Sequence, residues 1–206
     1  MDYSNFFSRI FFSFLFIITY IIIISYNFEL IFYLIFLIYF LISFEVFLNF
    51  KKFIILPLFY ISLSFLFFLT IDFDLIIFKS FNLFILIVIF FDTFSYIIGK
   101  LFGKYKIIKI SPQKTLEGLL GGFFITVFLS LIISYILDFN LNIKLFIFIM
   151  LIIFSAFVGD ILESFFKRKN NLKNSSEIIP GHGGLFDRFD SFLFSIIFYS
   201  IFINFL

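Results

Sequence analysis

The sequence of 206 residues contains no cysteine, no tryptophan and a single histidine, and only 14% of its residues are charged. The absence of cysteine excludes disulfide scaffolds and thiolate metal sites, and it leaves the redox compartment undetermined. A soluble domain carries roughly 25% charged and 45–50% apolar residues, whereas this chain is 63% hydrophobic. Composition therefore excludes a soluble globular domain and predicts an integral membrane protein. The net charge of +2 is too small to indicate a nucleic-acid partner.

Alanine, proline and arginine are also scarce, whereas phenylalanine occurs 43 times. We attribute this pattern to a coding bias toward A and T, because Phe, Ile, Asn and Lys have such codons and Ala, Gly, Pro and Arg do not. Residues that are rare under this bias are informative where they cluster. All nine glycines lie between Gly99 and Gly184, and two of the three arginines are Arg168 and Arg188. Function is therefore expected in the second half of the chain.

Apolar runs long enough to cross about 30 Å of hydrocarbon predict an all-α polytopic membrane protein with about seven transmembrane helices. The connection near Asn27 is short, which leaves a re-entrant hairpin as an alternative for the first two runs. A signal peptide over residues 1–26 is disfavoured because the residues before Asn27 make a poor cleavage site. The predicted spans are 10–26, 28–49, 53–71, 80–98, 117–137, 143–159 and 190–206.

The basic residues predict the orientation of these spans. With a cytoplasmic amino terminus, 13 of the 15 Lys and Arg residues lie on the cytoplasmic side, and only Lys79 and Lys144 lie outside. The positive-inside rule favours this arrangement. It places both long polar loops, 99–116 and 160–189, in the cytoplasm, where a cytosolic substrate reaches them. We divide the chain into amino-terminal helices, 1–79, and a catalytic region, 80–206.

Asp92 and Glu45 are carboxylates that lie inside predicted spans rather than at their starts. Asp92 is close to the cytoplasmic end of the fourth span, where burial of its charge costs roughly 2.5–3.5 kcal/mol, so it is a functional candidate. The structural alternative is a hydrogen bond within the bundle, for instance with Ser95. Glu45, near the end of the second span, is weaker evidence because its side chain can extend to the membrane interface.

The end of the sixth span places several polar residues on one helical stripe, at offsets of three, four and seven residues. Carboxylates at a bilayer surface that face phosphates suit a hard cation with oxygen ligands, which predicts Mg²⁺. The alternative is a solvated helix end with an internal ion pair. The stripe consists of Asp160, Glu163, Ser164 and Lys167.

The first polar loop has the composition of a phosphate-binding loop, with glycines that free backbone amides and polar residues beside a helix amino terminus. It is not a P-loop, because no strand precedes it. The alternatives are a lipid-headgroup anchor and, for Gly121 and Gly122, close helix packing. Its candidate substrate-binding residues are Ser111, Lys114, Thr115 and Glu117.

The second polar loop is the more specific of the two. Its run from Pro180 to Gly184 reads Pro-Gly-His-Gly-Gly, which predicts a tight turn with Gly183 and Gly184 at positive φ. Asp187 and Asp190 follow, three residues apart on one face of the last span and near its positive end. His182 sits in this constrained turn and is a functional candidate.

These residues resemble the phosphatidate cytidylyltransferases, also called CDP-diacylglycerol synthases. The resemblance covers about residues 92–191 in the order and approximate spacing of that family. The second loop resembles the family's signature. The stretch from Asp92 to Gly122, which includes the first loop, resembles its other well-marked region, and Gly159, Asp160, Glu163 and Ser164 match a third. The signature residues are Ser164, Lys167, Arg168, Lys173, Pro180, Gly181, His182, Gly183, Gly184, Asp187, Arg188 and Asp190.

The resemblance implies transfer of a cytidylyl group from CTP to phosphatidic acid in the bilayer, with Mg²⁺ required and a second cation left open. Asp160 and Asp187 are the implied cation ligands. Lys114 and its loop would hold phosphates, and His182 would orient the nucleotide or a phosphate. The implied location is the bacterial cytoplasmic membrane, with the site facing the cytoplasm and a homodimer left open. The implied catalytic residues are Asp160, Lys167, Arg168, His182, Asp187, Arg188 and Asp190, and the implied substrate-binding residues are Asp92, Ser111, Lys114, Thr115, Glu117, Glu163, Ser164, Lys173, Gly183 and Gly184.

Two departures from the family stand out. Asn174 occupies a position where the family usually has aspartate, and the helices in 1–79 are fewer than is common. The rival hypotheses are a CTP-dependent kinase or cytidylyltransferase acting on another lipid such as a polyprenol, and a non-enzymatic transporter or lipid-binding scaffold. A transporter would place polar residues near the midplane, often in repeated halves, and the sequence shows no internal repeat.

Overall fold

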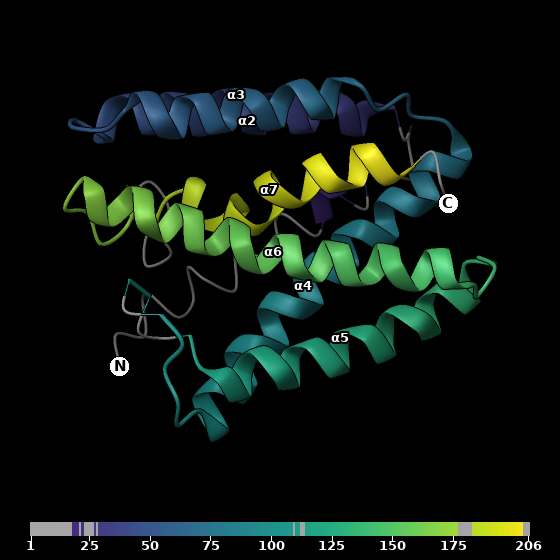
Figure 1. The fold of residues 1–206 in the computed structure, drawn as a ribbon. Coiled ribbons are helices and arrows are strands. Elements are labelled where there is room, and N and C mark those ends of the chain that lie inside the picture. The colour runs from purple at the N-terminus through teal and green to yellow at the C-terminus, as the bar shows by residue number, and fades with distance from the viewer. Residues whose placement is uncertain are drawn as a thin grey trace. The chain divides into compact units, whose positions relative to one another are not determined.

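The computed structural model of the chain describes residues 18–20, 22, 27, 29–108, 110–111, 114–176 and 183–203. The named elements over these residues are helices, and an isolated bridge joins Lys106 to Thr115. Figure 1 shows the helices with the labels used below. They are α2 (Leu30–Asn49), α3 (Ile55–Leu69), α4 (Leu75–Phe102), α5 (Leu116–Ile136), α6 (Ile143–Lys169) and α7 (Phe186–Phe202).

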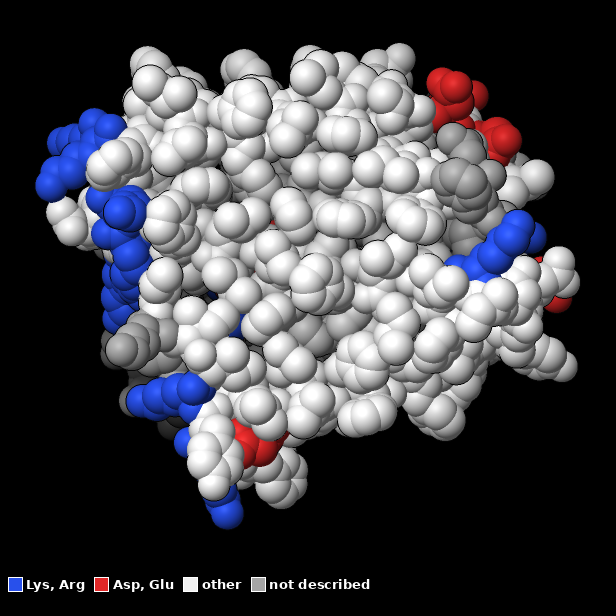
Figure 2. Space-filling model, in the orientation of Figure 1, with Lys and Arg blue, Asp and Glu red and all other residues white. Residues whose placement is uncertain are grey.

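Four of these helices, α2, α4, α5 and α6, are long and apolar enough to cross a membrane. α3 is apolar but has only 15 residues. Most of the surface in Figure 2 is uncharged, with Lys, Arg, Asp and Glu side chains at its margins. The predicted all-α membrane protein is therefore confirmed, whereas the predicted helix at 10–26 lies mostly outside the described residues.

The other predicted spans coincide with helices, but several boundaries were wrong. α6 continues to Lys169 and α7 begins at Phe186, so residues 160–169 and 186–189 are helical rather than part of a loop. α4 likewise runs from Leu75 to Phe102 rather than from residue 80 to residue 98, so residues 99–102 are also helical rather than part of a loop. The prediction followed hydropathy, whereas a helix continues through polar residues that leave the hydrocarbon. The basic last turn of α6 also complements the negative end of its dipole.

Polar side chains cap the amino-terminal ends of α4 and α6. Asp74 accepts a hydrogen bond from the Ile77 amide at 2.7 Å at the start of α4, and Asn142 accepts one from the Leu145 amide at 2.9 Å at the start of α6. α5 and α6 are followed by residues at positive φ, Asp138 at 62° and Asn171 at 56°. Asp and Asn tolerate this conformation better than other non-glycine residues do, which explains where these helices end.

The chain divides into two compact units, and α3, α6 and α7 each contribute residues to both. Unit 1 consists of Met1–Ser62 and Phe166–Phe189, and unit 2 of Leu63–Phe165 and Asp190–Leu206.

Within unit 1, the turn between α2 and α3 is tied to the end of α6. The Asn170 side chain accepts hydrogen bonds from the amides of Lys52, at 2.9 Å, and Phe53, at 3.3 Å. Aromatic contacts support this connection, with Phe50 against Phe186 at a centroid distance of 5.9 Å. The start of α7 therefore packs on the end of α2.

Within unit 2, α4 and α5 lie side by side (Figure 1), and glycines allow their close approach. A Cβ atom at Gly122 would lie 2.7 Å from the Ser95 amide nitrogen, and one at Gly118 would lie 2.9 Å from the Gly99 Cα. A Cβ atom at Gly121 would meet the Ile98 side chain. Close helix packing, one of the two alternatives for Gly121 and Gly122, is thus confirmed.

We expect Gly122→Ala to destabilise the protein by about 1–3 kcal/mol, because the added methyl group has no space against the α4 backbone. Thermal unfolding in detergent measures the effect. Leu120→Ala is the matched control, since Leu120 is 45% exposed on the same helix. Equal melting temperatures for Gly122→Ala and the parent protein would contradict this account of the α4–α5 contact.

Candidate functional site

In unit 2, carboxylates from α6 and α7 come together. Oxygen atoms of Asp160, Glu163 and Asp190 lie within 4.8 Å of one another. Glu163 is only 1% exposed, and Asp160 and Asp190 are half-buried. The approach of the two helices depends on Gly159, where a Cβ atom would lie 2.6 Å from the Asp190 carbonyl oxygen. The predicted stripe on α6 thus meets the last helix through its acidic residues, which we call the acidic cluster.

Lys114 reaches the acidic cluster from the loop before α5. Its Nζ lies 2.6 Å from an Asp160 carboxylate oxygen, and its side chain is 14% exposed. The same nitrogen lies 3.5 Å from the Phe157 carbonyl oxygen and 4.9 Å from the centre of the Phe157 ring. These contacts hold the ammonium group where it partly neutralises the cluster.

Asp92 is connected to the acidic cluster through α7. The Ser191 hydroxyl donates a hydrogen bond to Asp92 Oδ1 at 3.0 Å, and the Ser191 amide donates to Asp190 Oδ1 at 2.8 Å. The alternative in which Ser95 holds Asp92 is wrong. Ser95 packs against Gly122, and its buried hydroxyl has no hydrogen-bond partner among the residues described.

The loop from Gly103 to Thr115 is a hairpin that orients Lys114. Backbone hydrogen bonds join the Ile107 amide to the Lys114 carbonyl at 3.0 Å, and the Leu116 amide to the Tyr105 carbonyl at 2.9 Å. The predicted substrate-binding residues Thr115 and Glu117 support this hairpin. Thr115 accepts from the Gly118 amide at 3.2 Å, and Glu117 accepts from the amides of residues 104 and 105 at 3.0 and 3.3 Å.

In unit 1, Asp187 organises the turn before α7. It accepts a hydrogen bond from Lys167 Nζ at 2.8 Å, and the two side chains are 14% and 11% exposed. It also accepts from the Ser175 amide at 3.0 Å and from the Gly184 amide at 2.9 Å. A carboxylate that receives charge-assisted bonds from three groups is held in one orientation. The structure therefore brings the predicted residues Lys167, Asp187 and Gly184 together.

The glycine prediction was half right. Gly183 has φ of +83°, as predicted, and a Cβ atom there would meet Asp187. Gly184 does not adopt positive φ. It is glycine for lack of space, because a Cβ atom would meet Glu45 Oε1 and the hydroxyls of Ser175 and Ser176. The sequence does not distinguish these two requirements.

Glu45 is the residue that sequence reasoning undervalued. The sequence suggested that its side chain extends to the membrane interface. Instead, the side chain is fully buried in unit 1. Glu45 Oε2 accepts hydrogen bonds from the amides of Leu185 at 2.7 Å and Phe186 at 3.3 Å, the first residues of the α7 turn. The signal available in the sequence was one carboxylate in a helix of otherwise uncharged residues.

The remaining predicted residues are dispersed. Arg168 is exposed and donates to the Leu172 carbonyl at 3.0 Å, Lys173 and Arg188 are exposed, and Ser164 is buried. The Ser111 carbonyl accepts from the Lys114 amide at 3.1 Å. His182 lies outside the described residues. Asp160 belongs to the acidic cluster and Asp187 to the Lys167 pair, so a cation shared by Asp160 and Asp187 stays a prediction.

The acidic cluster fits a Mg²⁺ ion. Oxygen atoms of the three side chains lie within 4.8 Å of one another, and carboxylate oxygens are the kind of hard ligand that Mg²⁺ prefers. All three side chains supply hard oxygen donors, and the Lys114 ammonium lies beside Asp160. Asp160, Glu163 and Asp190 are therefore the residues that would hold the ion.

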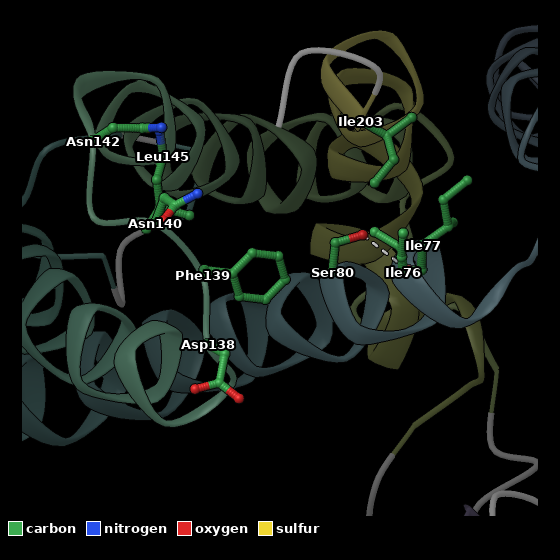
Figure 3. A pocket seen from close by; sticks show the side chains of 9 residues that line it. All are labelled: Ile76, Ile77, Ser80, Asp138, Phe139, Asn140, Asn142, Leu145 and Ile203. Atoms are coloured by element: carbon green, nitrogen blue, oxygen red, sulfur yellow. Dashed lines mark hydrogen bonds between the residues drawn. The ribbon is translucent and has the colours of Figure 1, made fainter.

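A separate cavity of about 170 Å³ lies in unit 2 between the start of α4, the α5–α6 turn and the end of α7. In Figure 3, Ser80 donates to the Ile77 carbonyl, and the Asp138 carboxylate points away from the other labelled side chains. No predicted site residue lines this cavity, so it is not the candidate site. Its lining residues are Ile76, Ile77, Ser80, Asp138, Phe139, Asn140, Asn142, Leu145 and Ile203.

Comparison with known proteins assigns the family. Proteins named phosphatidate cytidylyltransferase from Staphylococcus aureus (strain COL), Staphylococcus epidermidis and Staphylococcus saprophyticus are each 42% identical to the chain over 106 residues. The aligned segment covers 50% of this chain but only 40% of each relative. Residues 2–206 match the sequence model of the cytidylyltransferase family. The chain therefore belongs to the cytidylyltransferase family.

Proposed function

We propose that this chain is a phosphatidate cytidylyltransferase, which transfers the cytidylyl group of CTP to phosphatidic acid and releases pyrophosphate. The observation that carries the proposal is the acidic cluster of Asp160, Glu163 and Asp190 with Lys114 beside it, in a chain of this family. The named relatives support the choice of lipid.

In this reaction a phosphate oxygen of phosphatidic acid attacks the α-phosphorus of CTP, and the bond between the α-phosphorus and its bridging oxygen breaks. Both reactants are anions, so the protein contributes mainly positioning and charge neutralisation. Mg²⁺, when bound by the acidic cluster, supplies charge neutralisation for the triphosphate. Lys114, held by Asp160 and the Phe157 carbonyl, neutralises phosphate oxygens.

The cluster around Asp187 contributes a second set of charges. Lys167 is fixed by Asp187, and Arg168 and Arg188 are exposed near the ends of α6 and α7. We assign these cations to the lipid phosphate or to the departing pyrophosphate. Asp92 orients Ser191 by accepting its hydroxyl hydrogen bond, and Ser191 is the neighbour of Asp190 in α7. Thr115 and Glu117 act indirectly, by shaping the hairpin that carries Lys114.

The experiment uses purified protein, phosphatidic acid vesicles, Mg²⁺ and CTP labelled at either the α- or the γ-phosphate. A cytidylyltransferase transfers the α-label to lipid and releases the γ-label as pyrophosphate. A CTP-dependent kinase transfers the γ-label to lipid and releases CDP. A polyprenyl phosphate acceptor tests the choice of lipid. The proposal would be refuted if only γ-labelled CTP transferred its label to lipid. It would also be refuted if neither labelled form of CTP transferred label to phosphatidic acid.

We infer further that the protein lies in the bacterial cytoplasmic membrane with the hairpin that carries Lys114 in the cytoplasm, because the basic residues concentrate on that side. The chain has no cysteine, so single cysteines report topology directly. In intact cells, an impermeant maleimide should label Asn140→Cys in the exposed α5–α6 turn but not Lys104→Cys in the exposed hairpin. Inverted vesicles should reverse this pattern, and the opposite result would contradict the orientation.

A further inference from the structure

Glu45 is an unusual residue for its position in unit 1. It lies in α2, whose residues from Leu30 to Asn49 are otherwise uncharged, and its side chain is 0% exposed. A buried carboxylate without partners is strongly unfavourable in such surroundings. The groups that donate hydrogen bonds to Glu45 therefore indicate the role of its carboxylate.

Those contacts are the first backbone donors of α7. Glu45 Oε2 receives the amides of Leu185 and Phe186 at 2.7 and 3.3 Å, across 140 residues of sequence. The first amides of a helix have no partner within the helix and carry the positive end of its dipole. A carboxylate supplied by a distant helix thus takes the place of the usual local cap.

The amides of this turn are divided between two carboxylates. Asp187 accepts the Gly184 amide at 2.9 Å, and Glu45 accepts the next two. The second oxygen of Glu45 faces Gly184, where no side chain fits, and has no hydrogen-bond partner among the described residues. The position of the Asp187 backbone therefore depends on where Glu45 holds Leu185 and Phe186.

We propose that Glu45 is a positioning residue for the reaction: it fixes the start of α7 so that Asp187 and Lys167 keep their paired geometry. This proposal deepens the proposed function and rests on it for its kinetic effect. Under this proposal the amino-terminal part of the chain supports the turn that carries Asp187, through one hydrogen-bond acceptor in α2.

The first test measures hydrogen exchange of the peptide that covers residues 183–190, which requires no activity. In Glu45→Ala, the amides of Leu185 and Phe186 should exchange about 10-fold faster or more, because they lose a charged acceptor. Glu29→Ala is the matched control, since Glu29 is exposed next to the start of the same helix. Amides in the buried part of α4 around Ile87 report whether the variants remain folded.

The second test compares steady-state kinetics. Glu45→Ala should lower kcat by about 10-fold or more, with a smaller change in KM for CTP, because Glu45 itself does not contact a substrate. Glu45→Gln keeps an acceptor for both amides and should restore kcat to within about threefold of the parent. The same rescue should appear in the exchange of the Leu185 and Phe186 amides.

Unchanged exchange at Leu185 and Phe186 in a folded Glu45→Ala protein would overturn the positioning role. A Glu45→Gln variant as impaired as Glu45→Ala would also overturn it, since that result requires the charge rather than the acceptor. If the parent protein fails to transfer label from CTP, the proposed function fails instead, and the exchange experiment still decides whether Glu45 holds the turn.

Discussion

Asp160→Asn is expected to lower kcat/KM for CTP by about 1000-fold, because several kcal/mol of charge stabilisation depend on an occupied cation site. Asp160 is the residue that links the features of the acidic cluster, since it lies with Glu163 and Asp190 and is paired with Lys114 at 2.6 Å. The amide keeps the size of the side chain but has no charge with which to hold Mg²⁺. The variant should lose activity mainly because it binds Mg²⁺ more weakly. Raising the Mg²⁺ concentration should therefore restore part of the activity.

The control is Asp138→Asn, which makes the same chemical change at an exposed aspartate in the α5–α6 turn. Its φ of 62° is tolerated by Asn, so the fold should be kept. Binding of Mn²⁺, followed by electron paramagnetic resonance without CTP, reports the cation site independently of turnover. Full activity and unchanged Mn²⁺ binding in Asp160→Asn would contradict the assignment of the acidic cluster.

Asp187→Ala is expected to destabilise the protein by about 3–5 kcal/mol and to reduce activity by about 100-fold or more, because it breaks the ion pair with Lys167 between two mostly buried side chains. The two side chains are 11% and 14% exposed and 2.8 Å apart. Asp187 also holds the amides of Ser175 and Gly184, so the turn before α7 loses several bonds at once. Thermal unfolding in detergent and label transfer from CTP measure the two effects.

A double-mutant cycle separates structure from catalysis. Lys167→Ala should also destabilise, because it leaves the carboxylate with less compensation. The double variant Lys167→Ala/Asp187→Ala should be more stable than Asp187→Ala alone, since no unpaired charge remains. It should nevertheless stay inactive, because the cation assigned to phosphate is gone. Recovery of activity together with stability would show that this pair has only a structural role. Asp72→Ala, at an exposed aspartate between α3 and α4, is the control.

Much of this protein was predictable from its sequence. Apolar runs of sufficient length predict membrane helices because the bilayer leaves the backbone few alternatives. Clusters of glycine, carboxylate and lysine in a chain so rich in phenylalanine marked the segments that carry Asp160, Lys114 and Asp187. The offsets of three and four residues on α6 correctly predicted that Asp160 and Glu163 share a face, because helical periodicity is a local property.

Contacts between distant segments were not predictable in the same way. Hydropathy placed the end of α6 at residue 159, but the helix continues through polar residues to Lys169. The sequence did not show that Thr115 caps α5 through the Gly118 amide or that Glu117 accepts the Lys104 amide; their predicted substrate-binding role stays a prediction. Ser191, rather than the helical neighbour Ser95, is the partner of Asp92.

The sequence by itself determined the class of protein, its helices and the short list of polar residues, since these follow from local composition and periodicity. Only the tertiary structure decided which carboxylates meet, why Gly184 is glycine, and that Glu45 holds the start of α7. The physical reason is that a buried charge must find its partners wherever the fold supplies them, and here the donors lie 140 residues further along the chain.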